Sequence, residues 1–389
     1  MKLFGISPAP PAAPPMNYVH QRRANLFREL KTEAVDAVLI TNPRNVTYLS
    51  GFHGDSSYLI LTPKQAILVS DSRFEEELRD ENPELEAVIR PHTKTIQEAT
   101  AETLTKLAVK SIGFESNHVS MALLESLKEK GPKLSFAPIG PKIEQLRSIK
   151  DPSEIEQVRD AVRIAERAFH MFQAFLTERD SEKDCVDAME SYLRRAGAKC
   201  SAFPTIVSYG ERGALPHARP TNRMLLENSK LLVDWGADAG YKSDMTRTFR
   251  SPYNPAPNRK NRSERVGMKF QEIFDAVVEA QQAAADVLKH GTPAKDVDSA
   301  ARKVLDTYGL NDYFTHGLGH GIGLDVHEAP QIRQSSEAVL EAGMIVTLEP
   351  AVYIAGWGGV RVEDMYLITK DDAPAIRLTT LPSAISAVS

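Results

Sequence analysis

The chain of 389 residues is longer than a single hydrophobic core usually organises, so two domains are expected. Its net charge of −5, with a pI near 6.1, gives no electrostatic reason to expect a nucleic acid or an anionic membrane as a partner, and no run of about eighteen apolar residues occurs that would span a bilayer. Only two cysteines occur, Cys185 and Cys200, which excludes a disulfide framework and a thiolate zinc cluster and favours a reducing, cytoplasmic location.

The first part of the chain contains a proline-rich extension followed by mixed helix and strand patterns. Pro8–Pro15 consists largely of proline and alanine, which predicts a disordered extension over residues 1–16. From Asn17 onward, a helix is expected through Arg23–Leu30, and several short apolar runs predict strands. The expected strands are Ala37–Ile40, Tyr58–Leu61, Ala66–Val69, Ala87–Ile89 and Ile112–Phe114. Residues 17–148 are therefore expected to form an α/β domain.

A strong helix start marks the beginning of a second domain, over residues 149–389. Asp151 is a suitable N-cap, Pro152 fits the first helical position, and Glu154 completes a capping box. The apolar residues that follow keep helical spacing, which predicts a long amphipathic helix. Further helices are expected over Ser181–Gly197, over Glu264–Lys289 and from Thr292 to the neighbourhood of Gly309. Because β-type segments separate these helices, we expect an α+β domain in which helices cover one face of a mainly antiparallel sheet.

The segment Lys230–Phe249 has the pattern of a β-hairpin that carries two aspartates. Two β-type runs flank the turn-forming stretch Ala237–Gly240. If Asp234 and Asp244 are directly opposed, the turn is centred on Ala239 and their Cβ atoms lie about 4.5–5.5 Å apart on one face. Two unpaired carboxylates at this distance destabilise a hairpin unless a cation lies between them. The first hairpin therefore predicts a pair of metal ligands.

A second hairpin is expected between Glu349 and Glu363, and it repeats this arrangement. With the turn centred on Gly356, the two glutamates are opposed, and Tyr353 and Arg361 lie on their face of the hairpin. Acidic residues on the surface of hairpins are the alternative explanation for either pair taken alone. Two separate hairpins that each place acids in opposition instead indicate a site built around metal ions.

A glycine-rich segment ahead of the second hairpin supplies an imidazole. His320 lies in the stretch His316-Gly-Leu-Gly-His320-Gly-Ile-Gly-Leu, and His327 follows it. Glycines at four places in this stretch allow the backbone to come close to an ion or a ligand. A ligand set dominated by oxygen favours Mn²⁺, Fe²⁺ or Co²⁺ over an all-sulfur zinc site. The predicted metal ligands are Asp234, Asp244, His320, Glu349 and Glu363.

Four motifs together resemble those of the pita-bread metallopeptidases: VDWGADAGYKSDMTRTF, HGLGHGIGLDVHE, TLEPAVYI and GGVRVEDM. Within that family the chain is most similar to the Xaa-Pro peptidases, aminopeptidase P and prolidase. GFHGDSSYLILT and VSDSRFEEE resemble, more weakly, the creatinase-type N-terminal domain. The resemblance covers nearly the whole chain and implies a creatinase-like first domain and a pita-bread catalytic domain. One departure is the interval of ten residues between the two aspartates, where the family commonly has one residue more, and we interpret it as a tighter turn.

The resemblance implies a dinuclear metal centre with a defined role for each ligand. Asp244 and Glu363 would bridge both ions. Asp234 would complete the coordination shell of one ion, and His320 and Glu349 that of the other. A water or hydroxide between the ions would be the nucleophile, because two positive charges lower its pKa, and Glu349 would accept its proton. The ion expected is Mn²⁺, with Co²⁺, Fe²⁺ or Zn²⁺ as alternatives.

The same resemblance implies roles for five further side chains. His327 would stabilise the oxyanion or hold the scissile carbonyl group. His217, in Ala-Leu-Pro-His-Ala-Arg-Pro, would contact the scissile bond and assist the leaving imino nitrogen, and a turn histidine with no chemical role is the alternative. His316, Tyr353 and Arg361 would lie around the substrate. Tyr353 and Arg361 fit a structural cross-strand pair equally well.

The expected function is hydrolysis of the peptide bond in front of a proline at the second position of a peptide, by a dinuclear-metal exopeptidase. Aminopeptidase P acts on longer peptides, whereas prolidase acts on dipeptides and must bind their free carboxylate, for which Arg219 is a candidate partner. We favour the aminopeptidase type and keep the dipeptidase as the alternative. By resemblance, the protein would be a homodimer.

Other functions fit the sequence less well. Methionine aminopeptidases usually lack a first domain of this kind, and creatinase works without metal and lacks the full ligand set. A non-catalytic binding protein is the alternative from a different class, with the basic stretch Arg259–Arg265 as the only feature in its favour. Reuse of the fold for binding normally erodes the metal ligands, and here all five remain.

Overall fold

The computed structural model describes residues 16–225, 230–250, 263, 266–370 and 373–385. They form two compact units, one ending at Arg147 and the other beginning at Ser148. The predicted proline-rich extension lies outside the described residues except for Met16, where the first helix begins, and the basic stretch at 259–265 lies outside them except for Ser263. None of the described helices combines the length and the apolar character needed to cross a bilayer.

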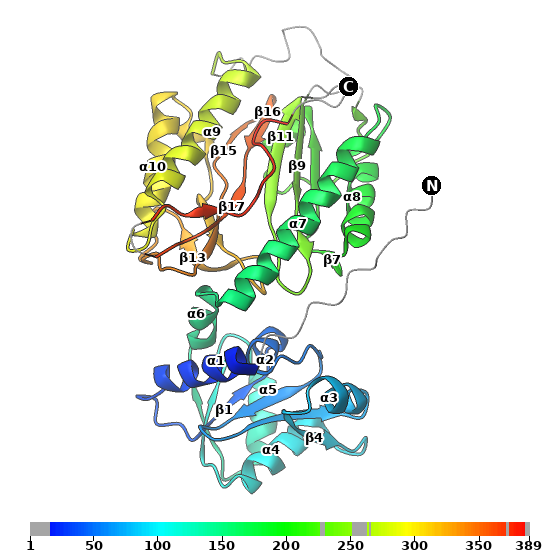
Figure 1. Cartoon of the computed structure of the whole chain (residues 1–389), viewed down its shortest axis with the longest axis vertical. Coiled ribbons are helices and arrows are strands. Elements are labelled where there is room, and N and C mark those ends of the chain that lie inside the picture. Colours follow the sequence, from blue (N-terminus) through cyan, green and yellow to red (C-terminus); the bar gives the residue numbers. More distant parts are fainter. Residues whose placement is uncertain (1–15, 226–229, 251–262, 264–265, 371–372, 386–389) are drawn as a thin grey trace. The chain divides into compact units, whose positions relative to one another are not determined.

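The first unit is an α/β domain built on a six-stranded sheet with the order β4-β3-β2-β1-β5-β6 (Figure 1). The pairings of β1 with β2 and of β2 with β3 are antiparallel. The pairings of β3 with β4, of β1 with β5 and of β5 with β6 are parallel. The strands are β1 Ala37–Ile40, β2 Tyr58–Leu61, β3 Ala66–Asp71, β4 Glu86–Arg90, β5 Ser111–Phe114 and β6 Ser135–Pro138. The helices are α1 Met16–Glu29, α2 Pro43–Ser50, α3 Glu75–Glu81, α4 Ile96–Lys106, α5 Met121–Lys130 and α6 Lys142–Ser148. The five predicted strands are confirmed: four are short, mostly buried apolar runs between turn-forming residues, and β4 pairs with β3 although its side chains are exposed or half-buried.

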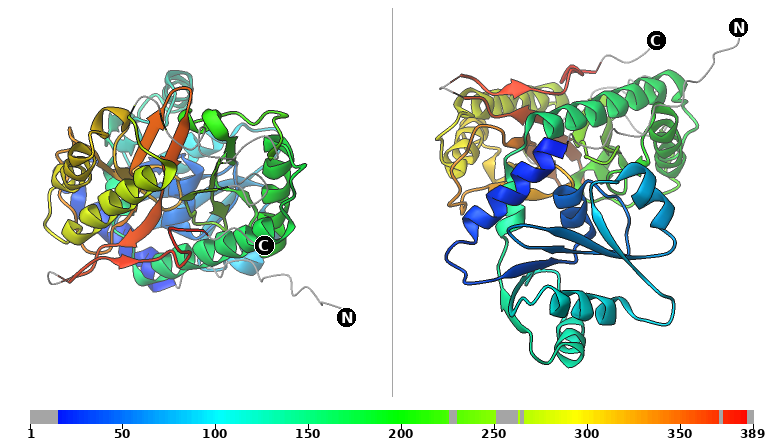
Figure 2. Two further views of the ribbon diagram at one scale, coloured as in Figure 1. Left: turned by 90° about the horizontal axis from the view of Figure 1, so that it is seen from above. Right: turned by 60° about the horizontal axis from the view of Figure 1, so that its bottom comes forward.

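The second unit contains two pairs of packed helices with the strands between them (Figure 1, Figure 2). The helices are α7 Pro152–Phe175, α8 Glu182–Ala196, α9 Phe270–Val287 and α10 Ala294–Thr307. The predicted capping box is confirmed, because Asp151 accepts from the backbone N–H of Glu154 and Glu154 accepts from that of Asp151. The expected start of the third helix near Glu264 is wrong: α9 begins at Phe270, because Gly267 has a φ of +66° that interrupts a helix.

All strand pairings in the described part of this unit are antiparallel, as the α+β prediction requires. The strands are β7 Cys200–Ser201, β8 Ile206–Tyr209, β9 Lys230–Trp235, β10 Ala237–Asp238, β11 Met245–Arg250, β12 Gly319–Gly321, β13 Glu328–Ile332, β14 Ile345–Leu348, β15 Ala351–Ile354, β16 Gly358–Arg361, β17 Asp364–Leu367 and β18 Ile376–Arg377. They form the groups β11-β9-β8, β13-β12-β14-β17-β18, β15-β16 and β10-β7. The apolar face of α9 packs on β14, β15 and β16, and α10 packs on α9 and β13, with all of them in one buried cluster.

The register of the first hairpin differs from the predicted one by two residues. Asp234 pairs with Thr246, so the turn is centred on Gly240 and not on Ala239. Gly240 has a φ of +102° and donates its N–H to the Asp238 side chain at 3.0 Å, which places the turn there. The direct opposition of Asp234 and Asp244 is therefore wrong. Because the shift is an even number, both aspartates still point to the same face, as diagonal neighbours.

The register of the second hairpin is the predicted one. Ala351 pairs with Arg361 and Ile354 with Gly358, so the turn is centred on Gly356, whose φ is +79°. The same register continues beyond this ribbon, where Leu348 of β14 pairs with Asp364 of β17. Glu349 and Glu363 lie at the junctions between these two pairings. A single continuous register therefore brings the two glutamates to opposite positions.

Candidate metal centre

Three of the predicted ligands form a compact buried group. Ligand atoms of Asp244, His320 and Glu363 all lie within 4.8 Å of one another. Asp244 directly precedes β11, His320 is the central residue of β12, and Glu363 lies between β16 and β17. The group therefore depends on three segments that are distant in the sequence and meet only through the packing of the sheets.

The other two predicted ligands lie beside this group. The Nε2 atom of His320 is 3.6 Å from Oε1 of Glu349 and 3.7 Å from Oδ2 of Asp244. Asp234 accepts a hydrogen bond from Arg361 at Oδ2, over 2.6 Å. Its Oδ1 atom is buried and has no hydrogen-bond partner among the described residues. An unpaired carboxylate oxygen in a buried site fits a cation as its partner.

The electrostatics of the group also fit a bound cation. Burial, together with the charges of Glu363 and Asp234, raises the pKa of Asp244 well above its usual range. Burial and the charge of Asp234 raise the pKa of Glu363 to about 8, and burial lowers the pKa of His320 to about 4. The pKa values of Asp244 and Glu349 stay raised although Arg361 already pairs with Asp234, so all four carboxylates can remain ionised together only with further positive charge beside them. The residues present are therefore suited to divalent ions.

The glycines on either side of His320 let the backbone come close to neighbouring strands, whereas the sequence predicts a close approach to an ion or a ligand. A Cβ atom on Gly319 would lie 2.0 Å from the carbonyl oxygen of Thr347, and one on Gly321 would lie 2.0 Å from that of Ala329. Side chains at these positions would push β12 away from its neighbours. The Nδ1 atom of His320 lies 3.0 Å from the carbonyl oxygen of Gly321, so a proton on Nδ1 is held there and Nε2 is left for a metal.

Three further predicted histidines lie around the group. The ring of His327 is 4.3 Å from that of His320, measured between centroids. His316 has its Nε2 atom 3.0 Å from the hydroxyl of Tyr353. His217 lies on an exposed turn after the short helix η1, Gly210–Ala214. Burial and, after it, the charge of His217 lower the pKa of His327.

Arg361 and Tyr353 form a contact within the second hairpin. Arg361 is 3% exposed and uses all three nitrogens: Nε donates to Thr246 at 2.9 Å, and its two Nη atoms donate to Tyr353 and Asp234, each at 2.6 Å. The Tyr353 hydroxyl in turn contacts His316. These contacts agree with the cross-strand pair that the sequence left open. They direct the guanidinium towards Asp234.

Sequence reasoning missed Thr246, although a signal was present. Its hydroxyl donates to Oε2 of Glu363 at 2.8 Å and accepts from Arg361, and the residue is fully buried. Thr246 lies two residues after Asp244, so the alternation of a strand places both on one face. Applying that alternation beyond the aspartates would have identified it.

Glu182 was also missed, and nothing in its local sequence indicates its role. This fully buried carboxylate accepts from the backbone N–H of Tyr209 at 2.8 Å and from Thr221, at 2.9 Å from the N–H and 2.6 Å from the hydroxyl. It also pairs with Arg212 at 3.1 Å. Glu182 therefore joins both ends of the segment that carries His217.

The antiparallel sheet between helix pairs and its buried cluster of acids and imidazole define a metal-dependent hydrolase. The chain belongs to metallopeptidase family M24, whose model matches residues 156–370, and its first unit matches the Creatinase/Prolidase N-terminal domain over residues 22–149. This membership implies divalent metal ions and a peptide substrate.

Relatives and solved structures match nearly the whole chain. The Xaa-Pro dipeptidase of Pyrococcus furiosus is 35% identical over 361 residues, which cover 92% of this chain and 98% of the relative. The structure of an Xaa-Pro dipeptidase from Bacillus anthracis has a TM-score of 0.85 at 30% identity and covers 94% of this chain and 100% of its own. An X-Pro aminopeptidase from Thermotoga maritima has a TM-score of 0.83 at 30% identity, with coverage of 92% and 100%.

Proposed function

We propose that this protein hydrolyses the peptide bond between an N-terminal residue and a proline. The observation that carries this proposal is the buried group of Asp244, His320 and Glu363, with further acids and histidines around it. The names of the relatives from Pyrococcus furiosus, Bacillus anthracis and Thermotoga maritima support the specificity for proline. A peptide bond before proline has no N–H, so a site shaped for it differs from that of a general peptidase.

The proposed centre holds two divalent ions, with Mn²⁺ preferred and Co²⁺, Fe²⁺ or Zn²⁺ as alternatives. Asp244 and Glu363 are proposed to hold both ions. Asp234 would serve one of them, and His320 and Glu349 the other. The short distances from His320 to Asp244 and Glu349 support this division, and so does the unpaired Oδ1 atom of Asp234. When bound, the ions would lower the pKa of a water molecule and polarise the scissile carbonyl group.

The proposed proton acceptor from this water is Glu349. Its side chain is 19% exposed, compared with 7% for Asp244 and 11% for Asp234, so water and substrate reach it more easily. The pKa of Glu349 is raised by burial and by the charge of Glu363, which suits a group that takes up a proton. His327 and His217 are exposed, and we propose that they hold the scissile carbonyl and the leaving nitrogen.

We propose positioning roles around the substrate for the buried side chains behind these groups. Arg361 orients Asp234 by a hydrogen bond. The Tyr353 hydroxyl contacts both Arg361 and His316 and so orients the His316 ring. Because both Arg361 and His316 contact its hydroxyl, the ring of Tyr353 has a fixed orientation beside the proposed substrate pocket. This assignment replaces direct substrate binding as the main role of Arg361, since its nitrogens are already occupied.

For substrate length, we propose Xaa-Pro dipeptides as the preferred class. Our expectation from the sequence favoured longer peptides, and the name of the Thermotoga maritima structure agrees with it. The names of the Pyrococcus furiosus and Bacillus anthracis proteins support dipeptides. The exposed side chain of Arg219, two residues from His217, is the proposed partner of the dipeptide carboxylate. The proposed cytoplasmic location rests on the two free cysteines, and the proposed homodimer rests on family resemblance.

The test is hydrolysis by metal-stripped protein that has been refilled with Mn²⁺. Three substrates are compared: an Xaa-Pro dipeptide, a longer peptide beginning Xaa-Pro, and a peptide beginning Met-Ala. We expect fastest turnover of the dipeptide and its loss in Asp244→Asn. Preference for the longer Xaa-Pro peptide would move the assignment to the aminopeptidase type. No turnover of any substrate, with metal demonstrably bound, would contradict the peptidase assignment and favour a binding protein.

A further inference from the structure

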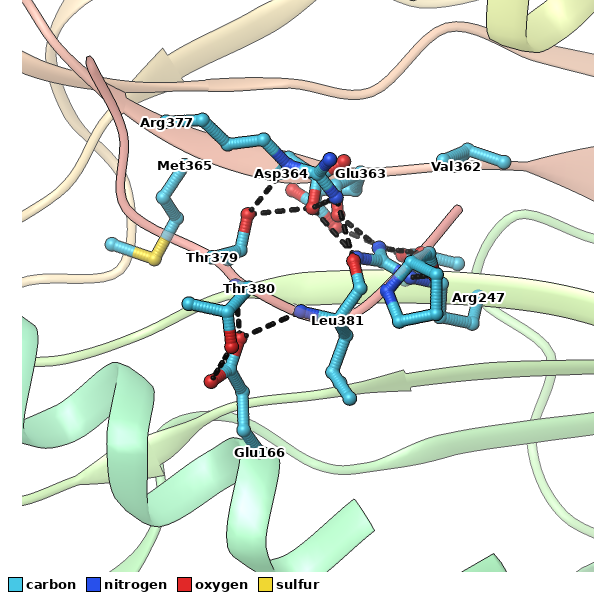
Figure 3. A network of polar contacts seen from close by, with 12 residues as sticks. Glu166, Arg247, Val362, Glu363, Asp364, Met365, Arg377, Thr379, Thr380 and Leu381 are labelled. Carbon is cyan, nitrogen blue, oxygen red and sulfur yellow. Dashed lines mark hydrogen bonds and ion pairs between the residues drawn. The ribbon is translucent and has the colours of Figure 1, made fainter. Parts of the chain in front are cut away.

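A buried network of polar contacts lies behind the proposed ligand Glu363 (Figure 3). Its centre is an ion pair between Arg247 and Asp364, at 2.7 Å, and both side chains are fully buried. Arg247 lies on β11 three residues after Asp244, and Asp364 directly follows Glu363. Strand alternation therefore turns this pair away from the metal face while leaving it covalently next to the ligands.

Arg247 connects the chain segment that carries Asp244 with the one that carries Glu363. Its Nη1 atom donates to the carbonyl oxygens of Thr246 at 2.9 Å and Glu363 at 2.6 Å. Glu363 also donates its backbone N–H to the carbonyl oxygen of Thr246 at 3.1 Å. The described residues of these two segments have no assigned strand pairing with each other, so these bonds, together with those between the Thr248 hydroxyl and the backbone of Arg361, hold the Glu363 backbone against β11.

A short segment near the end of the chain closes the network. We define the C-terminal strap as residues 376–382. Arg377 and the Thr379 hydroxyl donate to Oδ1 of Asp364 at 2.8 and 2.6 Å, and Arg247 donates to the carbonyl oxygens of Leu381 and Pro382, each at 2.9 Å.

The C-terminal strap is also bonded to helix α7. Glu166 of α7 accepts from the backbone N–H and the hydroxyl of Thr380 and from the N–H of Leu381 (Figure 3). The strap lies beyond residue 370, where the family match ends.

We propose that Arg247, Asp364 and the C-terminal strap form a brace that positions Glu363 for metal binding. The inference rests on the proposed role of Glu363 as a metal ligand. Arg247 and Asp364 touch neither metal nor substrate in this arrangement and are positioning residues. A buried charge pair with every arginine nitrogen bonded resists displacement, because each lost bond would leave a buried polar group unpaired. That rigidity holds the Glu363 carboxylate where the other ligands meet.

The test compares metal binding by the metal-stripped full chain and its variants. Asp364→Asn keeps the shape of the side chain and removes the charge that Arg247 needs. We expect its Kd for Mn²⁺, from titration calorimetry, to rise about 10- to 100-fold, as for other partners of metal ligands. The visible absorption of bound Co²⁺ is expected to change as well, because it reports ligand geometry. Far-UV circular dichroism confirms that the variant is folded.

The matched control is Asp71→Asn in the first unit. Asp71 is also a buried aspartate that accepts from two arginines, Arg73 at 2.9 Å and Arg90 at 3.1 Å, but it holds no predicted ligand. We expect its Mn²⁺ affinity and Co²⁺ spectrum to match those of the wild type. If Asp364→Asn does not fold, Thr379→Val replaces it. This variant removes one hydrogen bond to Asp364, and we expect about three- to tenfold weaker Mn²⁺ binding.

Each outcome has a separate meaning. Wild-type Mn²⁺ affinity and Co²⁺ spectrum in folded Asp364→Asn or Thr379→Val would overturn the brace. An equal loss of affinity in Asp71→Asn would also overturn it, because the effect would then follow general destabilisation. Wild-type affinity in Glu363→Gln would instead contradict the ligand assignment on which the inference rests. Weaker binding in Asp364→Asn, with Asp71→Asn unchanged and Glu363→Gln impaired, supports the brace.

Discussion

At the scale of single residues, Thr246 links the predicted ligand Glu363 to Arg361 through its hydroxyl. Its hydroxyl donates to Glu363 and accepts from Arg361, which in turn holds Asp234. Thr246→Val keeps the volume of the side chain and removes both bonds. We expect kcat/KM on the Xaa-Pro dipeptide to fall about 10- to 100-fold at saturating Mn²⁺, because two ligands lose their orientation together.

Thr248 offers a matched control on the same strand. Its hydroxyl is equally buried and bonds the backbone of Arg361, at 2.9 Å to the carbonyl oxygen and 3.0 Å to the N–H, without touching a ligand carboxylate. We expect Thr248→Val to lower the free energy of unfolding by about 1 kcal/mol and to leave kcat/KM near the wild-type value. Equal kinetic losses in the two variants would show that Thr246 acts through stability alone.

Lys230 is a buried lysine away from the metal ligands. It is 4% exposed, donates to the carbonyl oxygen of Trp357 at 2.6 Å and lies 3.5 Å from the centre of the Trp357 ring. The ring and the carbonyl favour the ammonium form, but burial outweighs them and lowers the pKa of Lys230 to about 7. The unfolded chain, with an ordinary lysine pKa, therefore binds more protons than the folded chain between about pH 7 and 10.5.

Stability is therefore expected to rise with pH in this window through Lys230. The free energy of unfolding of the wild type, relative to Lys230→Met, should increase by up to about 1.4 kcal/mol per pH unit from pH 7 towards pH 10. Urea denaturation of both proteins at pH 7, 8 and 9 measures the difference. A difference that stays constant, or falls with pH, would show that Lys230 keeps its charge in the folded protein.

At the scale of elements, the two hairpins show what the sequence can predict. The second hairpin has a single glycine-rich turn, and its register follows from the spacing of Glu349 and Glu363. The first hairpin has several turn-forming residues in a row, so the opposition of Asp234 and Asp244 did not identify the turn centre. The turn is centred on Gly240 because this residue has a positive φ and donates its backbone N–H to the side chain of Asp238. An even shift keeps each side chain on its original face of the ribbon, so Asp234 and Asp244 still share one face, as predicted.

The segment between Tyr209 and Thr221 depends on one carboxylate of another element. Glu182, in the first turn of α8, bonds Tyr209, Arg212 and Thr221 and so fixes the base of the turn that carries His217. We expect Glu182→Gln to lower kcat/KM about 10- to 100-fold, because a small displacement of a group at the scissile bond is costly. Steady-state kinetics on the dipeptide measure the loss.

A double variant separates positioning from general destabilisation. If Glu182 acts by placing His217, then Glu182→Gln combined with His217→Ala will be no slower than the slower single variant. Additive losses would contradict this role. Glu211→Gln is the control: this exposed carboxylate pairs with Arg223 in the same segment, and surface pairs contribute little. Its kinetics are expected to match the wild type.

At the scale of the whole molecule, all five predicted ligands belong to the second unit. A metal that binds only the folded state stabilises the part that holds it, by about 2.7 kcal/mol at one hundred times its Kd. Addition of Mn²⁺ to metal-stripped protein is therefore expected to slow amide hydrogen exchange in β9, β11 and β12 and to leave peptides from residues 16–147 unchanged. Hydrogen exchange followed by mass spectrometry reports both units in one sample.

The contrasting outcome has a clear meaning. Equal protection of residues 16–147 on addition of Mn²⁺ would show that the two units unfold as one cooperative body. No protection in either unit would show that the acids do not hold Mn²⁺. The exchange data thus test the metal site without relying on a substrate.

The whole-molecule comparison also shows where sequence reasoning stops. The division into two units and the gathering of Asp244, His320 and Glu363 could be predicted because helix caps, alternation and turn glycines are local signals. The contacts of Glu182 and the brace of Arg247 and Asp364 join residues far apart along the chain. No local pattern marks such partners, because a buried charge is identified by what surrounds it after folding.

The position of the strap in the sequence determines when the brace behind Glu363 can form during synthesis. Residues 376–382 leave the ribosome after every predicted ligand has emerged, so the growing chain holds its acids and imidazole before it can close the brace. A nascent chain that ends before residue 376 would carry all five predicted ligands and still lack the strap that closes the proposed brace.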